Sequence, residues 1–116
     1  MAPGLRLLSV AGQIGWDKQG RLVGADFTAQ FAQALANVAS VVRAAGGTTD
    51  DVLSLRLYVT DKRRYLAQIK EVGAAYRTLF GRHSPAMALV QVADLLEEGA
   101  LIEIEALAAV PAEAAP

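Results

Sequence analysis

Two carboxylates near the C-terminal end of the chain have the spacing of an acid–base site. Glu103 and Glu105 lie in the apolar segment LIEIEAL, residues 101–107. Alternate residues of a strand face the same side, so the two carboxylates share one face, about 7 Å apart. Carboxylates among apolar residues lose hydration, which favours the protonated form, and such groups serve as general acids or bases. The same pattern also fits an ion-paired or solvated pair of glutamates.

Three further features carry weaker signals. His83 is the only histidine and stands in a loop, where an exposed structural role competes with a catalytic one. A Ser-His-Asp triad would need a buried aspartate and a nucleophile turn that this sequence does not display. The basic run of residues 62–64 is typical of a solvated helix face. Trp16 stands in a glycine-rich loop, where it could line a pocket or an interface, or pack in the core.

The composition excludes several kinds of site. The 116 residues include no Cys and a single His, which excludes disulfides, thiolate metal sites and two-histidine metal motifs. No phosphate-binding glycine motif is present, so we expect neither a metal nor an organic cofactor. A net charge of −1 offers no electrostatic attraction for nucleic acid or an anionic membrane. With no signal-like N-terminus and no apolar run near ~18 residues, we expect a cytoplasmic protein.

The elements that must position these residues follow from periodicity and capping. Apolar residues at helical spacing predict one helix from the cap Asp26 to Gly46 and another from the cap Asp61 to Gly81. Strands are predicted over 5–14, 52–60, 87–93 and 101–110. In the second strand, Leu53, Leu55, Leu57 and Val59 are expected on one face. This order predicts an α+β fold in which two helices pack on one face of a mixed sheet.

The other face of that sheet is expected to be open and apolar. Met87, Leu89 and Leu101, or their alternating neighbours, would lie on it. Hydrophobic residues make up 53% of the chain, more than a small domain can bury by itself. We therefore expect an oligomer that covers this face. Residues 1–110 are predicted to form one domain, and residues 111–116, PAEAAP, a disordered tail.

Eight short motifs recur here in an order typical of one protein family. They are Ala11-Gly-Gln-Ile14, Leu22-Val-Gly24, Gln33-Ala-Leu-Ala-Asn37-Val, Ala44-Ala-Gly46, Asp51-Val, Tyr58-Val-Thr-Asp61, Tyr76-Arg-Thr-Leu-Phe80-Gly with Ser84-Pro85-Ala86, and Ile102-Glu-Ile-Glu105-Ala. On these motifs the chain resembles the RidA/YjgF family, also called Rid or L-PSP proteins. The resemblance covers roughly residues 5–110.

The resemblance implies a chorismate mutase-like α+β fold and a homotrimer with small-molecule clefts between its subunits. It also implies hydrolysis of reactive enamines and imines to ketoacids and ammonia, without a metal or an organic cofactor. In the family, an Arg after Pro-Ala pairs with the substrate carboxylate. The first Glu of the Glu-x-Glu pair, which matches Glu103, helps to position the attacking water.

This sequence departs from the family pattern around the pocket. Met87 replaces the carboxylate-binding Arg, and Met cannot make that charge-assisted contact. Ala11 replaces the serine of the usual Ser-Gly-Gln, and Leu89 stands where a small polar residue is common. The resemblance therefore predicts an apolar pocket with one carboxylate. Its residues would be Glu103 as the catalytic group and Ala11, Gly12, Trp16, Met87 and Leu89 as substrate-binding residues.

Three functions are consistent with such a pocket. The first is hydrolysis of an enamine or imine other than an ordinary 2-imino acid. The second is a non-catalytic trimer that binds a small molecule or regulates through it. The third is an endoribonuclease, an activity attributed to some members of the family, although the net charge and the single histidine count against RNA as a partner.

Overall fold

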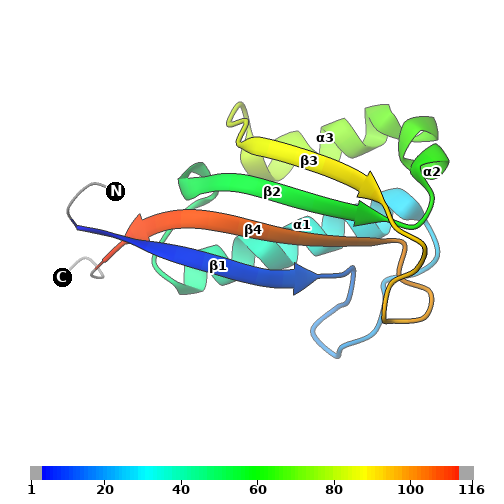
Figure 1. The fold of residues 1–116 in the computed structure, drawn as a ribbon, viewed down its shortest axis with the longest axis horizontal. Coiled ribbons are helices and arrows are strands. Elements are labelled where there is room, and N and C mark those ends of the chain that lie inside the picture. Colours follow the sequence, from blue (N-terminus) through cyan, green and yellow to red (C-terminus); the bar gives the residue numbers. More distant parts are fainter. Residues whose placement is uncertain (1–3, 113–116) are drawn as a thin grey trace.

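A computed structural model describes residues 4–112 as one four-stranded sheet with its helices on a single face. Figure 1 looks onto the uncovered face, with α1 and α3 behind the sheet. The elements are β1 (Leu5–Gln13), α1 (Phe27–Ala44), the short 3-10 helix η1 (Thr49–Asp51), β2 (Val52–Val59), α2 (Lys62–Ala67), α3 (Ile69–Phe80), β3 (Ala86–Gln91) and β4 (Ile102–Pro111). No helix within residues 4–112 is both long and apolar enough to cross a bilayer.

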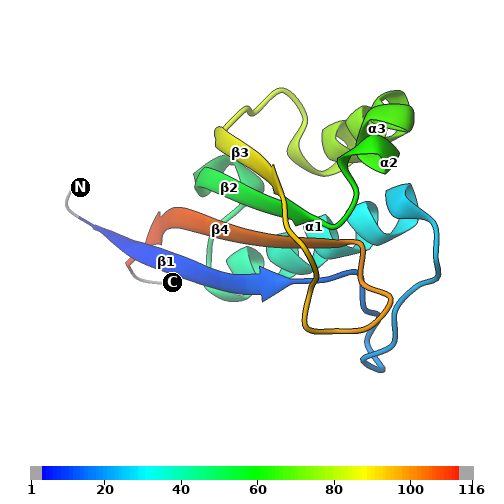
Figure 2. The ribbon, with the colours of Figure 1, turned by 45° about the vertical axis from the view of Figure 1, so that its right-hand side comes forward.

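The sheet is mixed, as the element order predicts. Its strand order is β1-β4-β2-β3. The central strand β4 is antiparallel to both β1 and β2, whereas β3 is parallel to β2. The edge strands are therefore β1 and β3, at opposite sides of the sheet in Figures 1 and 2. The predicted fold class, an α+β fold with helices on one face of a mixed sheet, is confirmed.

Helix α1 forms where its caps and apolar stripe predict it. The Asp26 carboxylate accepts a hydrogen bond from the backbone N–H of Ala29 at 3.0 Å, which satisfies a free donor of the first turn. Leu35, Val38 and Val42 share one helical face and are fully buried against the sheet. This face and β4 build the core that fixes the sheet in place.

The second predicted helix is divided into two helices, α2 and α3, because the helical conformation is interrupted at Gln68. The Gln68 side-chain oxygen accepts hydrogen bonds from the backbone N–H and the hydroxyl of Thr28, at 3.1 and 2.9 Å. Its side-chain nitrogen donates to the Asp26 carboxylate at 3.1 Å. These contacts attach the break to the start of α1. Leu66 and Ile69, which periodicity places on the apolar stripe, are 57% and 48% exposed beside it.

Strand β2 is confirmed, but Leu53 lies on a different face from the predicted one. The pairing with β4 shifts register between Val52 and Ser54. A bulge of this kind reverses the alternation on one side of it. Leu53 is consequently 48% exposed, while Leu55 and Leu57 are buried as predicted.

The uncovered face carries the alternating neighbours of Met87 and Leu89. Met87 pairs in register with Leu55 and Leu89 with Leu57, and both β2 residues face the helices. Met87 and Leu89 therefore face the helices too, which leaves Ala86, Ala88 and Val90 on the uncovered side. Leu101 is half-buried against the core. Strand β4 includes Pro111, one residue into the segment expected to be a tail, and residues 113–116 lie outside the described part.

Candidate active site

A β-bulge in β1 places Gly12 directly against Glu103. Val10 pairs with Ala106 and Gln13 with Ile104, so Ala11 and Gly12 together oppose a single residue of β4. A Cβ atom on Gly12 would lie 2.7 Å from the Glu103 carboxyl carbon and 2.9 Å from one of its oxygens. The Glu103 carboxylate thus occupies the space that a side chain at position 12 would fill.

The two glutamates of β4 have different surroundings on the uncovered face. Glu105 accepts a hydrogen bond from the Tyr58 hydroxyl at 2.6 Å and pairs with Arg56 at 3.4 Å. This hydrogen bond and the nearby negative charge raise the pKa of Tyr58 above its ordinary value. Glu103 is half-buried, and no group of residues 4–112 donates a hydrogen bond to it. Of the two carboxylates, Glu103 is therefore the one available to hold water.

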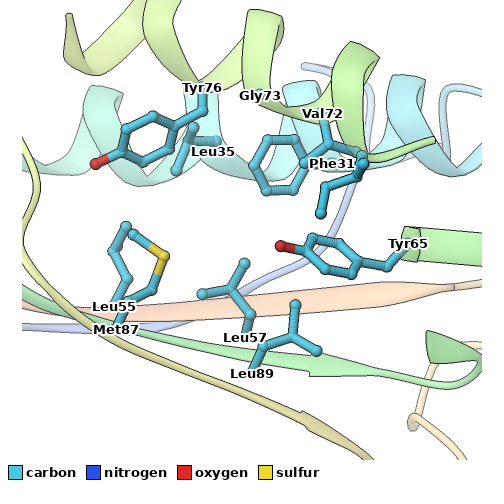
Figure 3. A pocket seen from close by; sticks show the side chains of 11 residues that line it. Phe31, Leu35, Leu55, Leu57, Tyr65, Val72, Gly73, Tyr76, Met87 and Leu89 are labelled. Carbon is cyan, nitrogen blue, oxygen red and sulfur yellow. The ribbon is translucent and has the colours of Figure 1, made fainter. Parts of the chain in front are cut away.

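An apolar cavity of about 210 Å³ lies on the opposite side of the sheet, between β2, β3 and the helices. Figure 3 shows side chains from all these elements around one space. The lining residues are Phe31, Leu35, Leu55, Leu57, Tyr65, Ile69, Val72, Gly73, Tyr76, Met87 and Leu89. None of them is charged, and Met87 is 50% exposed at its edge.

The predicted site residues therefore form two groups on opposite faces of the sheet. Ala11, Gly12 and Glu103 lie together at β1 and β4, and Met87 and Leu89 line the cavity. The helix-facing residues of β2 and β4 separate the groups. A single chain does not bring Glu103 and Met87 into one site.

Trp16 and His83 lie outside both groups. Trp16 is 37% exposed in the loop after β1, forms an isolated bridge with Leu22 and does not line the cavity. His83 Nε2 is 2.7 Å from the backbone oxygen of Val52, which makes this nitrogen the protonated one. Its ring stacks on Phe80 at a centroid distance of 6.4 Å, so it fastens its loop to the core. Within residues 4–112, no three His, Asp or Glu side chains are grouped as a metal ion requires.

Sequence reasoning missed the two tyrosines of the cavity. In the sequence, Tyr65 and Tyr76 stand on the apolar stripe of the second predicted helix, and the periodicity marks them only as apolar-face residues, although each has a polar tip. The Tyr76 hydroxyl donates to the backbone oxygen of His83 at 2.7 Å, and burial raises the pKa of Tyr76. The signal in the sequence was a tyrosine on an otherwise hydrocarbon helix face, where a buried hydroxyl requires a partner.

Comparison with known proteins identifies the family. The family model described as endoribonuclease L-PSP matches residues 4–110. The chain belongs to this family, the RidA/YjgF proteins. It is 39% identical to a RutC family protein of Pyrococcus horikoshii over 87% of this chain and 77% of that protein. It is 35% identical to the 2-iminobutanoate/2-iminopropanoate deaminase of Salmonella typhimurium, over 88% of this chain and 78% of the deaminase.

Solved structures of the family have the same fold. A Rid family protein of unknown function from Yersinia pestis superposes with a TM-score of 0.80 at 37% identity, over 90% of this chain and 79% of that one. The YjgF protein of Escherichia coli gives a TM-score of 0.74 at 36% identity, over 88% and 79% of the two chains. The relatives named as deaminases support imine hydrolysis at the level of the family.

Proposed function

We propose that this chain is a cofactor-independent hydrolase of small uncharged imines or enamines that works as a homotrimer. The observation that carries the proposal is the Glu103 carboxylate, half-buried against Gly12 with no partner among residues 4–112. A carboxylate that is free to accept a proton from water is the group that such a hydrolysis needs. The names of the deaminase relatives support the reaction type.

The proposed reaction consumes one water and needs no electron transfer. Water held by Glu103 adds its oxygen to the imine carbon, and the carboxylate takes one proton from it. The protonated Glu103 then returns this proton to the nitrogen, since one group serves as base and acid in turn. This gives a carbinolamine. Glu103 then takes the proton of the new hydroxyl group and passes it to the amine nitrogen, so that the C–N bond breaks and ammonia and a ketone or aldehyde leave. An enamine enters the same route once its carbon gains a proton and its nitrogen loses one, which gives the imine.

The trimer supplies what one chain lacks. Glu103 and the cavity lie on opposite faces of the sheet, so a second copy has to bring its Glu103 to the cavity of the first. The uncovered face supports assembly, because Leu7 and Val90 are 56% and 47% exposed on strands at its two edges. In this proposal, substrate binds where subunits meet, and a stable particle with the mass of one 12.2 kDa chain would contradict it.

The cavity determines the expected substrate charge. None of its described lining residues carries a positive charge that could pair with the carboxylate of a 2-imino acid, and Met87 stands at its edge. A charge-assisted hydrogen bond contributes about 1.5–3 kcal/mol, or roughly 10- to 150-fold in rate. We therefore expect little acceleration of 2-iminopropanoate hydrolysis, and a gain of that size in Met87→Arg.

The decisive experiment measures ammonia release from an uncharged imine that a flavin amine oxidase generates in situ. Glu103→Gln should lower the enzymatic rate by about 10²- to 10⁴-fold, the usual contribution of a general acid–base. Glu105→Gln is the matched control on the same strand and face, and should keep most of the activity. If the wild-type protein accelerates the hydrolysis of no imine, the hydrolase proposal is wrong and the non-catalytic binding role remains. Equal activity in Glu103→Gln would remove this carboxylate from the mechanism.

A further inference from the structure

Among the side chains that line the cavity, the Tyr65 hydroxyl is the one polar group without a hydrogen-bond partner within residues 4–112. The other cavity hydroxyl, on Tyr76, donates a hydrogen bond to the backbone oxygen of His83 at 2.7 Å. The remaining lining side chains are hydrocarbons and the thioether of Met87. Figure 3 shows the Tyr65 hydroxyl pointing into the space between the helices and β2. A ligand in this cavity therefore meets one hydrogen-bonding side chain in an otherwise apolar wall.

The ring of Tyr65 is held in place before any ligand arrives. It packs edge-on against Phe27, with ring centroids 6.3 Å apart and planes at 75°. Its helix α2 is capped at the N-terminus by Asp61, whose carboxylate accepts a hydrogen bond from the backbone N–H of Arg63 at 3.0 Å, and it ends at the Gln68 break. Helix α3 continues beyond that break with Val72 and Tyr76 in the cavity wall. A hydroxyl fixed in this way can select a ligand atom at a defined position.

The size of the cavity limits what can accompany that atom. An apolar cavity of about 150 Å³ lined by Leu, Ile and Phe is known to hold benzene. The present cavity, at about 210 Å³, has room for one aromatic ring or a branched alkyl group and a few further atoms. A charged group would lose its hydration there without gaining a counter-ion.

We propose that Tyr65 is the specificity-determining residue of this cavity and donates a hydrogen bond to an uncharged acceptor atom of the substrate. The substrate class is an aryl or branched alkyl imine or enamine with such an acceptor next to its apolar group. This inference rests on the proposed function for the reaction, but ligand binding tests it separately. The corresponding hydrolysis product is an uncharged arylalkyl ketone.

Three probes of one skeleton separate the contributions. Phenylacetone carries the ring and an uncharged acceptor, its carbonyl oxygen. In n-propylbenzene this oxygen is missing, and in phenylpyruvate a carboxylate replaces the methyl group of phenylacetone. Their affinities are measured by NMR titration for wild-type protein, Tyr65→Phe and Tyr76→Phe. The Phe variant at position 65 keeps the ring and its contact with Phe27, so the fold is retained.

We expect Tyr65→Phe to weaken phenylacetone binding by about two- to thirteen-fold, the range for one net hydrogen bond. Its affinity for n-propylbenzene should stay within about two-fold of wild type, because the apolar wall is unchanged. Tyr76→Phe should preserve the ratio of the two affinities, since the Tyr76 hydroxyl already serves His83. In wild-type protein, phenylpyruvate should bind more weakly than phenylacetone.

Two results would overturn the inference. One is an unchanged phenylacetone affinity in Tyr65→Phe, and the other is phenylpyruvate binding at least as well as phenylacetone to wild-type protein. Failure of the hydrolase proposal gives a different result. In that case phenylacetone still binds through Tyr65, but the matching imine is not hydrolysed faster than in buffer. Turnover of that imine at the same kcat/KM in Tyr65→Phe would retain the hydrolase and reject Tyr65 as its specificity residue.

Discussion

Replacing Gly12 by Ala tests whether the position of the Glu103 carboxylate matters. The new Cβ would lie 2.7 Å from the carboxyl carbon of Glu103, and ordinary contacts begin at 3.4 Å. The carboxyl carbon must therefore retreat by about 0.7 Å, and a misplacement on the order of 1 Å in a catalytic group can reduce the rate about 10²-fold. We expect Gly12→Ala to lower turnover by roughly 10- to 100-fold.

The same change should cost little stability. Overpacking typically destabilises by about 1–3 kcal/mol, and Gly-to-Ala replacement returns about 0.4–1 kcal/mol by restricting the unfolded chain. The atoms that must move belong to a flexible, half-buried side chain, so the overpacking cost should be at its lower limit. We expect a loss of about 0–1 kcal/mol in the free energy of unfolding, measured by urea titration.

Gly15→Ala is the matched control three residues away. There, a Cβ would lie 2.7 Å from the Cα and 2.8 Å from the backbone oxygen of Gln30 in helix α1, which cannot rotate away. We expect a larger loss of stability, about 1–3 kcal/mol or more. Wild-type turnover in folded Gly12→Ala would refute the importance of the Glu103 position. An equal loss of stability in the two variants would refute the argument from side-chain flexibility.

Two other predictions concern the helices. Gly73→Ala in α3 should raise the free energy of unfolding by about 0.4–1 kcal/mol, because Ala is the better helix former and its Cβ meets only the guanidinium of the exposed Arg77, at 3.2 Å. An unchanged urea midpoint would contradict this. Hydrogen bonds from the Gln68 side chain and a backbone N–H lower the pKa of Asp26 below 3.8. The ionised group therefore stabilises the fold above pH 3.8, and this contribution is lost as the pH falls through the lowered pKa. Asp26→Ala should lower the melting temperature at pH 7, and the difference in melting temperature from wild type should be smaller at pH 3. An equal difference at both pH values would contradict the stabilising role of the ionised Asp26 carboxylate.

Local patterns were sufficient wherever one segment determines its own structure. The caps at Asp26 and Asp61 were predicted correctly, and so was the alternation that puts Glu103 and Glu105 on one face. The break at Gln68 could not be predicted, because its hydrogen bonds reach Thr28, 40 residues away. Such a partner leaves no periodic trace in the sequence around the break.

The phase of a strand is harder to predict than its period. Alternation separates Met87 from Ala88 but does not say which of them faces the helices. That choice follows from the pairing of Met87 with Leu55 across β3 and β2. The bulge that moves Leu53 arises in the same way, from pairing with β4 rather than from β2 itself. The division of the candidate site between two faces therefore became visible only with the sheet assembled.

That division allows a direct test of a shared site. Suppose that Glu103→Gln removes the carboxylate and Leu89→Trp fills the cavity, so that each variant alone is inactive. If a site takes Glu103 from one copy and the cavity from another, subunits mixed 1:1 by co-refolding restore intact sites. Each contribution is intact in half of the subunits, so about a quarter of the sites, and of the wild-type activity, should return. If both parts came from one copy, every site would still carry one defect. Persistent inactivity of a verified mixed oligomer would then exclude the shared site, because random assembly cannot avoid producing intact pairs.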